Sequence, residues 1–133
     1  MHMKMNPVVH FEMPAKDKSR VKKYYTEVFG WDMQQTGPET GEYILATTVP
    51  VDEKTQRPKE AGAINGGFYE YGDYGKTPHL VVSVDNLKEH IEKVKKSGGK
   101  IVGEIMDIPN VGKFVMTLDS EDNRIGMLQP VMP

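Results

Sequence analysis

One order of secondary-structure signals occurs twice along this chain, and this repeat constrains the fold more than any other feature. Apolar, β-branched runs around His10 and His79 predict two strands, and the two histidines lie 69 residues apart. The glycines that end the two following helices, Gly30 and Gly99, have the same spacing of 69 residues. Because further strands follow each glycine in the same order, the sequence predicts two copies of one βαβββ unit.

Local signals support the predicted helices and strands. Asp17 can cap the first helix, and Asp85–Asn86 the second, because their side-chain oxygens can accept from the free amides of a first helical turn. Apolar residues at helical spacing predict a buried stripe on the first helix, made of Val21, Tyr24, Tyr25 and Val28. The predicted strands cover residues 8–13, 31–36, 42–49, 63–71, 79–84, 100–108, 113–119 and 124–131, with an exposed polar loop at 50–62.

The 133 residues of the chain are enough for one domain, residues 1–133. Within it we expect module one at about residues 6–71 and module two at about residues 77–131. Each module would have one apolar sheet face that it cannot cover alone, so the two are expected to share a core.

Composition excludes several classes of function. The chain has no cysteine, which excludes disulfides, thiolate metal sites and a cysteine nucleophile, and fits a reducing cytoplasmic location. A net charge of −2 with interspersed signs argues against a nucleic-acid partner. No apolar stretch approaches the ~20 residues of a membrane span, and no signal peptide is evident. We therefore expect a soluble cytoplasmic protein, and we give His2 in the N-terminal segment no functional role.

Three residues near the strand starts could carry chemistry. His10 and His79 occupy equivalent places in the two units, and imidazole is a common metal ligand. The side chain of Glu12 should point to the same strand face as His10, because residues i and i+2 share a face. Glu12 could act as a catalytic general base or a ligand, or it could pair with a lysine or arginine. The histidines could equally be hydrogen-bonded residues that bind no metal.

Aromatic residues gather beside glycines in segment 66–75, and Trp31 begins the second predicted strand. Ring faces next to exposed backbone suit planar or cationic ligands, which makes these rings candidate ligand-binding residues. The alternative is that some of them belong to the core. The candidates are Trp31, Phe68, Tyr69 and Tyr71.

Segments 8–31, 79–102 and 114–130 resemble the vicinal oxygen chelate superfamily, which includes glyoxalase I, bleomycin and fosfomycin resistance proteins and extradiol dioxygenases. The resemblance implies an α+β fold in which two βαβββ modules form a curved mixed sheet around a cleft. It also implies a small-molecule ligand in that cleft and a homodimer.

In metal-dependent members of the family, ligands come from the first and last strands of each module. The resemblance places the first-strand histidines at His10 and His79. The last-strand ligands are commonly glutamates, but this chain has Gly126 at one match and Asn65, Gly66 and Gly67 at the other. A divalent metal is thus implied by the family while its usual acidic ligands are missing.

We therefore expect a glyoxalase-like protein that binds a small organic molecule and has a degraded or non-standard metal site. One alternative is an active metal-dependent lyase or dioxygenase that uses His10 and His79. Another is a non-catalytic protein that sequesters a drug-like molecule. Neither a nucleic acid nor a membrane is an expected partner.

Overall fold

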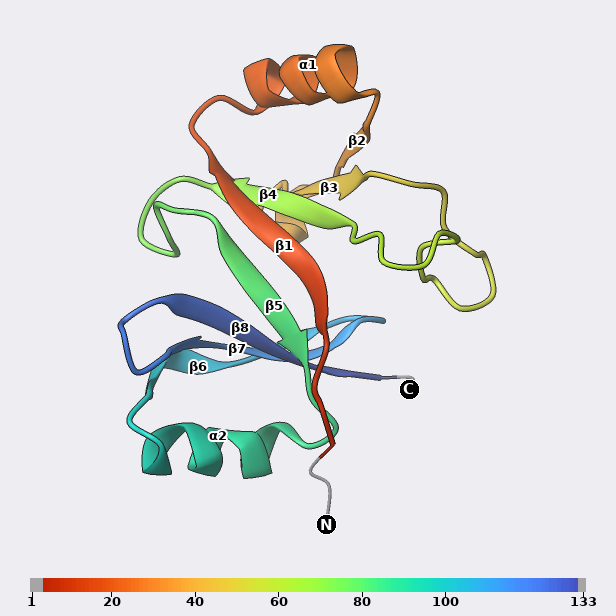
Figure 1. Ribbon diagram of the computed structural model, residues 1–133. Helices are drawn as coiled ribbons and strands as arrows, with labels where there is room; N and C mark the ends of the chain where they lie inside the picture. The colour runs from red at the N-terminus through yellow and green to blue at the C-terminus, as the bar shows by residue number, and fades with distance from the viewer. Residues whose placement is uncertain (1–3, 132–133) are drawn as a thin grey trace. The chain divides into compact units, whose positions relative to one another are not determined.

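The computed structural model describes residues 4–131, which form eight strands and two α-helices in the order that the sequence predicts (Figure 1). This mixture of strands and helices confirms the α+β class. His2 lies outside the described residues. The elements are β1 (Val8–Ala15), α1 (Lys18–Phe29), β2 (Asp32–Gln35), a 3-10 helix (Pro38–Thr40), β3 (Ile44–Thr47), β4 (Gly66–Glu70), β5 (His79–Ser83), α2 (Leu87–Lys96), β6 (Lys100–Ile108), β7 (Gly112–Leu118) and β8 (Arg124–Pro130).

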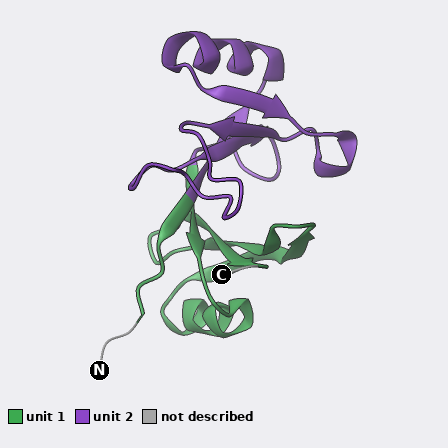
Figure 2. Ribbon diagram, turned by 90° about the vertical axis from the view of Figure 1, so that its right-hand side faces the viewer, with its two compact units in different colours: residues 1–9, 79–133 green, residues 10–78 purple. Residues whose placement is uncertain are grey.

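The chain divides into two compact units, which Figure 2 colours separately. Residues 10–78 form one unit, called module one below. Residues 79–133 together with residues 1–9 form the other, called module two. The divisions fall at His10 and His79, the two histidines that mark the repeat in the sequence.

Module one has the strand order β2-β3-β4-β1. β1 and β4 are parallel, whereas β2 and β4 each pair with β3 in antiparallel fashion. The core lies on the α1 side of the sheet, where alternate residues of the strands point toward the helix. Its buried members are Ala15, Ile44, Ala46 and Phe68, and Phe11, Val21, Tyr25 and Trp31 pack against them.

Module two repeats this plan with the order β5-β8-β7-β6, in which β5 and β8 are parallel. β7 pairs with β8 and β6 in antiparallel fashion. Its core lies under α2 and consists of Val84, Leu87, Val115 and Met127. Ile91 and Val94 of α2 pack against this core.

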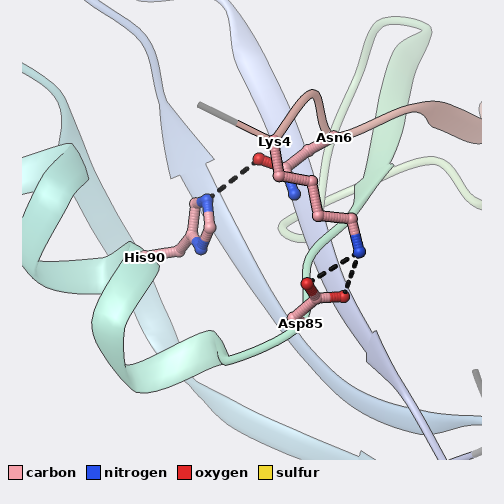
Figure 3. Close-up of polar contacts among 4 residues, drawn as sticks. All are labelled: Lys4, Asn6, Asp85 and His90. Atoms are coloured by element: carbon pink, nitrogen blue, oxygen red, sulfur yellow. Dashed lines mark hydrogen bonds and ion pairs between the residues drawn. The ribbon is translucent and has the colours of Figure 1, made fainter. Parts of the chain in front are cut away.

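Residues 4–7 attach to module two through three contacts. The Pro7 carbonyl accepts from the Ser83 amide at 2.9 Å. Figure 3 shows the other two: Lys4 reaches Asp85, and Asn6 faces His90 of α2. Asp85 therefore pairs with Lys4, while Asn86 supplies the helix cap by accepting from the Glu89 amide at 3.1 Å.

The ends of α1 are as predicted, but its buried stripe is not. Asp17 caps the helix by accepting from the Arg20 amide at 3.0 Å, and Gly30 ends it with a φ of 71°. Tyr24 and Val28 are each 53% exposed, so the prediction that they are buried is wrong. The apolar contact runs through Tyr25 and on to Trp31 beyond the helix end, where the two rings stack 4.8 Å apart. Tyr24 lies one position around the helix from this line and faces solvent.

Two further observations refine the predicted elements. β1 continues through Pro14 to Ala15, although Pro14 was the predicted end of that strand. Between residues 4 and 131, no helix has the length and apolar character needed to cross a membrane.

Candidate functional site

The first strand of module one carries two candidate residues on the face opposite α1. Phe11 and Ala15 of β1 belong to the α1-side core, so His10 and Glu12 point to the other face. Glu12 is only 8% exposed and His10 is half-buried. A buried carboxylate requires hydrogen-bond partners, since an ionised group without them is costly to remove from water.

Two tyrosine phenols engage the Glu12 carboxylate. The Tyr43 hydroxyl donates to Glu12 Oε2 at 2.8 Å, and the Tyr74 hydroxyl donates to Glu12 Oε1 at 2.9 Å. Tyr43 directly precedes β3, and Tyr74 lies in the loop between β4 and β5. His10 Nε2 lies 3.0 Å from the Tyr43 oxygen. We call these four residues, His10, Glu12, Tyr43 and Tyr74, the polar network.

The direction of hydrogen bonding in the polar network follows from proton counting. A phenol has one proton, and Tyr43 donates it to Glu12, so the Tyr43 oxygen can only accept from His10. His10 therefore carries its proton on Nε2. Burial first, and then the negative charge of Glu12, raise the pKa of the Tyr43 phenol far above its usual value of 10.0. Tyr43 is thus a neutral donor at any physiological pH.

Gly67 of β4 lies beside this network. Its register partner on β1 is Glu12, so position 67 points to the same face as the carboxylate. A Cβ atom added at Gly67 would collide with the Tyr43 hydroxyl and ring. The Tyr43 side chain occupies the space that any side chain at position 67 would need.

The donors on this face fit a metal ion poorly. Divalent metals in proteins are held by several donors, and anionic ones offset the charge. In module one the face provides His10, which could bind a metal only through Nδ1 because Nε2 carries a proton, and Glu12, whose two oxygens accept from phenols. Across residues 4–131, no three His, Asp or Glu side chains are grouped so that they could hold a metal. We therefore derive no chemistry through a metal.

His79 occupies the equivalent strand start in module two. It is 5% exposed and shares a face of β5 with Val81, which is 3% exposed. β7, which β8 separates from β5, contributes Phe114 and Met116, each 4% exposed, to the face opposite the α2-side core. Arg124 of β8 has the same parity as Gly126, the register partner of Val81, so this face of module two carries an arginine as well as apolar side chains.

The predicted aromatic residues are divided between the two faces of module one. Phe68, 1% exposed, and Trp31 pack in the α1-side core, so the structure does not bring them together with His10 and Glu12. Tyr69 lies on the polar face: its ring meets that of Tyr74 edge-on at 4.9 Å, and its hydroxyl donates to the Thr77 carbonyl at 2.5 Å. Tyr71 is 38% exposed, and the Lys16 ammonium lies 4.6 Å from its ring centre.

Tyr43 is not among the residues that the sequence predicts for the site, and Tyr74 enters only as a member of the aromatic group in segment 66–75. A signal for Tyr43 exists in the alternation of β3, because the core residues Ile44 and Ala46 force positions 43 and 45 to the other face. Tyr74 lies in a glycine-rich loop that has no periodicity, so sequence patterns cannot assign its direction.

Module two has a separate open pocket of about 330 Å³ at the first turn of α2. Leu87 and Gln129 line it together with the hairpin of β6 and β7, and the Gln129 side chain accepts from the Leu87 amide at 2.8 Å. The charged lining residues are Lys88, Asp107 and Lys113. Leu87 belongs to the α2-side core, so this pocket lies away from the sheet face that carries His79.

Comparison with known proteins gives one family. A family model described as the Glyoxalase/Bleomycin resistance protein/Dioxygenase superfamily matches residues 8–127. A glyoxylase-like domain-containing protein of Didymella fabae is 32% identical over 120 residues, which cover 84% of each chain. CFP32 of Mycobacterium bovis, which its name describes as a glyoxylase, is 26% identical over 89% of this chain. That match spans only 43% of the length of CFP32.

Solved structures give the same fold. Streptomyces coelicolor methylmalonyl-CoA epimerase, in complex with 2-nitronate-propionyl-CoA, has a TM-score of 0.67 at 10% identity over 97% of both chains. Hypothetical protein BH1468 of Bacillus halodurans has a TM-score of 0.65 at 12% identity over 94% of both chains. At these identities the likeness concerns the fold alone, and it confirms the predicted architecture.

Proposed function

The chain belongs to the Glyoxalase/Bleomycin resistance protein/Dioxygenase superfamily, and we propose that it binds a small organic molecule on the polar face of module one without a resident metal ion. The observation that carries this proposal is the position of the Tyr43 hydroxyl, which lies between His10 Nε2 at 3.0 Å and Glu12 Oε2 at 2.8 Å. A phenol thus connects His10, which the resemblance would make a metal ligand, with Glu12, the candidate general base.

The polar network supports ligand binding because its groups are held in place before a ligand arrives. Both Glu12 oxygens accept from phenols, which favours the ionised carboxylate. The edge-on rings of Tyr69 and Tyr74 add aromatic surface beside that charge. A negative charge next to ring faces suits a ligand with a planar or cationic group.

A metal-dependent lyase or dioxygenase that uses His10 and His79 is the first alternative. It would require His10 to bind the metal through Nδ1, because the hydrogen bond to Tyr43 places a proton on Nε2. Metal analysis of protein purified without chelators separates the two proposals. We expect far less than one Zn, Ni, Fe or Mn ion per chain; a stoichiometric metal that is lost on His79→Ala would support the alternative.

Sequestration and turnover are the two outcomes that a bound molecule could have. We favour binding without chemistry, because both oxygens of the proposed catalytic residue Glu12 accept from phenols. A ligand recovered unchanged after long incubation supports sequestration. If the wild type instead converts the ligand, and Glu12→Gln abolishes this conversion while it still binds the ligand, Glu12 would be a general base.

A thermal-shift screen of cationic and planar aromatic compounds tests the proposed site. We expect hits to raise the melting temperature of the wild type and to lose most of that shift in Tyr74→Phe. The matched control is Lys113→Ala, which alters only the lining of the pocket in module two. Hits that depend on Lys113 and not on Tyr74 would move the binding site to that pocket and contradict the proposal.

The oligomeric state belongs to the same proposal. A homodimer is what the family resemblance implies, and sedimentation velocity over a range of protein concentrations tests it. We expect a species of twice the 15.0 kDa chain mass, and a monomer at every concentration would contradict this part of the proposal.

A further inference from the structure

An aromatic ring covers a glycine of the last strand in each module, at equivalent positions. In module one the glycine is Gly67, which pairs with Glu12 on the first strand and Leu45 on the third. Tyr43 lies two residues before Leu45, and therefore on the same face. Its ring and hydroxyl occupy the place where a Cβ atom of residue 67 would lie.

In module two the glycine is Gly126, which pairs with Val81 on the first strand and Met116 on the third. Phe114 lies two residues before Met116, as Tyr43 lies two residues before Leu45. A Cβ atom at Gly126 would come within 2.5 Å of Phe114 Cε2. The two arrangements are equivalent by register, because the first-strand partners Glu12 and Val81 are 69 residues apart, the spacing of the repeat.

Neither ring can move aside at little cost. The Tyr43 hydroxyl is hydrogen-bonded to both His10 and Glu12. Phe114 is 4% exposed, and displacing a packed ring forces strained rotamers on its neighbours. A side chain added at either glycine must therefore displace a ring that is fixed in place.

We infer that this chain excludes a metal by packing as well as by lacking two carboxylates: Tyr43 and Phe114 fill the volumes of the last-strand ligands that the family resemblance implies. The inference rests on the metal-independent part of the proposed function. It predicts that restoring an acid restores metal binding only when the covering ring is removed as well.

Module one provides the direct test, with metal alone as the probe. Calorimetric titration of Zn²⁺ and Mn²⁺ should give no binding for the wild type. Gly67→Glu alone should also bind none and should melt at a lower temperature. The double variant Tyr43→Ala/Gly67→Glu places two carboxylates and one imidazole on neighbouring strands, and we expect it to show saturable metal binding that neither single variant shows.

A third substitution controls for where the metal binds. Adding Glu12→Gln to the double variant should remove this metal binding, because it removes one of the three proposed ligands. Metal binding by Gly67→Glu alone, at an unchanged melting temperature, would overturn the inference, because an acid would then fit beside Tyr43. A folded double variant that binds no more tightly than the wild type would also overturn it.

Module two is tested by thermal unfolding. Gly126→Ala should lower the melting temperature of the wild type, and the same change should cost clearly less in a Phe114→Ala background, where the ring is gone. Phe114→Leu serves as the background if Phe114→Ala does not fold. An equal loss in both backgrounds would overturn the inference for this module and leave the ligand-binding proposal for module one intact.

Discussion

Tyr43 is expected to remain protonated when other tyrosines of the chain ionise. Burial and the Glu12 carboxylate raise the pKa of its phenol above the usual 10.0. A pKa that is higher in the folded state than in the unfolded state stabilises the fold below the unfolded value, and this contribution is lost as pH rises above about 10. We predict that the urea midpoint of the wild type falls above pH 10 and that the midpoint of Tyr43→Phe falls less.

Absorbance at 295 nm provides a second reading of the same prediction. In folded protein, Tyr43→Phe should show the same change in absorbance between pH 7 and pH 11 as the wild type, because Tyr43 does not contribute. The control is the same pair of proteins unfolded in urea, where Tyr43→Phe should show a smaller change than the wild type, because the exposed Tyr43 phenol then has its usual pKa of 10.0. A smaller change in folded Tyr43→Phe would contradict the network as described.

Asp119 should make the turn between β7 and β8 sensitive to acid. Hydrogen bonds from Asn123, backbone first and then side chain, together with one from the Glu121 amide, lower the pKa of this carboxyl below its usual 3.8. A lowered pKa stabilises the fold above the unfolded value, and this contribution is lost as pH falls through the folded value. We predict that the Asp119 carboxyl carbon titrates below pH 3.8 by NMR and that Asn123→Ala raises its midpoint.

The candidate site was predictable from the sequence only where strand alternation fixes a face. The repeat identified His10 and His79, and the two-residue period placed Glu12 beside His10. The contact between Tyr43 and Gly67 could not be predicted, because it depends on the register between β3 and β4, which a long connection separates. Phe68 and Trp31 illustrate the converse. Phe68 is assigned to the core by the parity of its position in β4, and Trp31, directly before β2, packs against the same core.

At the scale of the helices, capping was predictable and burial was not. Asp17, Gly30 and Asn86 all act as the sequence predicts, because capping depends on local chain geometry. The prediction of a buried stripe on α1 was wrong for two of its four residues. Helical spacing defines a wide apolar sector of the helix surface, whereas a sheet of short strands contacts only a narrow part of that sector. Tyr24 and Val28 lie on the exposed edge of that sector.

The cap of α2 gives a prediction at the scale of this helix. Asn86 accepts from the Glu89 amide at 3.1 Å, so Asn86→Ala leaves that amide without its partner. We predict a loss of about 1 kcal/mol in the free energy of unfolding, measured by urea denaturation. Lys88→Ala is the matched control in the same turn and should change the stability by less than about 0.5 kcal/mol. An equal loss in the two variants would argue against the cap.

At the scale of the whole chain, module two is assembled from two separate stretches of sequence. Residues 4–7 contact β5, α2 and Asp85 in the connection between them, although more than 70 residues of chain intervene. Module one, by contrast, is continuous from residue 10 to residue 78. Contacts that close such a long segment carry an entropy cost. The few groups that make these contacts therefore contribute strongly to the stability of module two.

Asn6 is expected to be the more important of the two polar side chains in this N-terminal segment. It lies 3.1 Å from His90 Nε2, and the buried His90 Nδ1 has no hydrogen-bond partner among residues 4–131. Asn6→Ala would leave both ring nitrogens without partners, and we predict a loss of about 1–3 kcal/mol in the free energy of unfolding. The ion pair of Lys4 with Asp85 is largely exposed, so Lys4→Ala should cost less than about 1 kcal/mol.

Hydrogen exchange of the folded protein shows where this loss of stability acts. In Asn6→Ala, amides of β5 and α2 should exchange faster, while those of residues 18–47 in module one should exchange at the wild-type rate, because the missing contact belongs to module two. Lys4→Ala is the matched control, since it removes a contact of the same segment without removing a partner from a buried group. Faster exchange throughout both modules, or a larger effect from Lys4→Ala, would contradict the assignment of residues 4–7 to module two through His90.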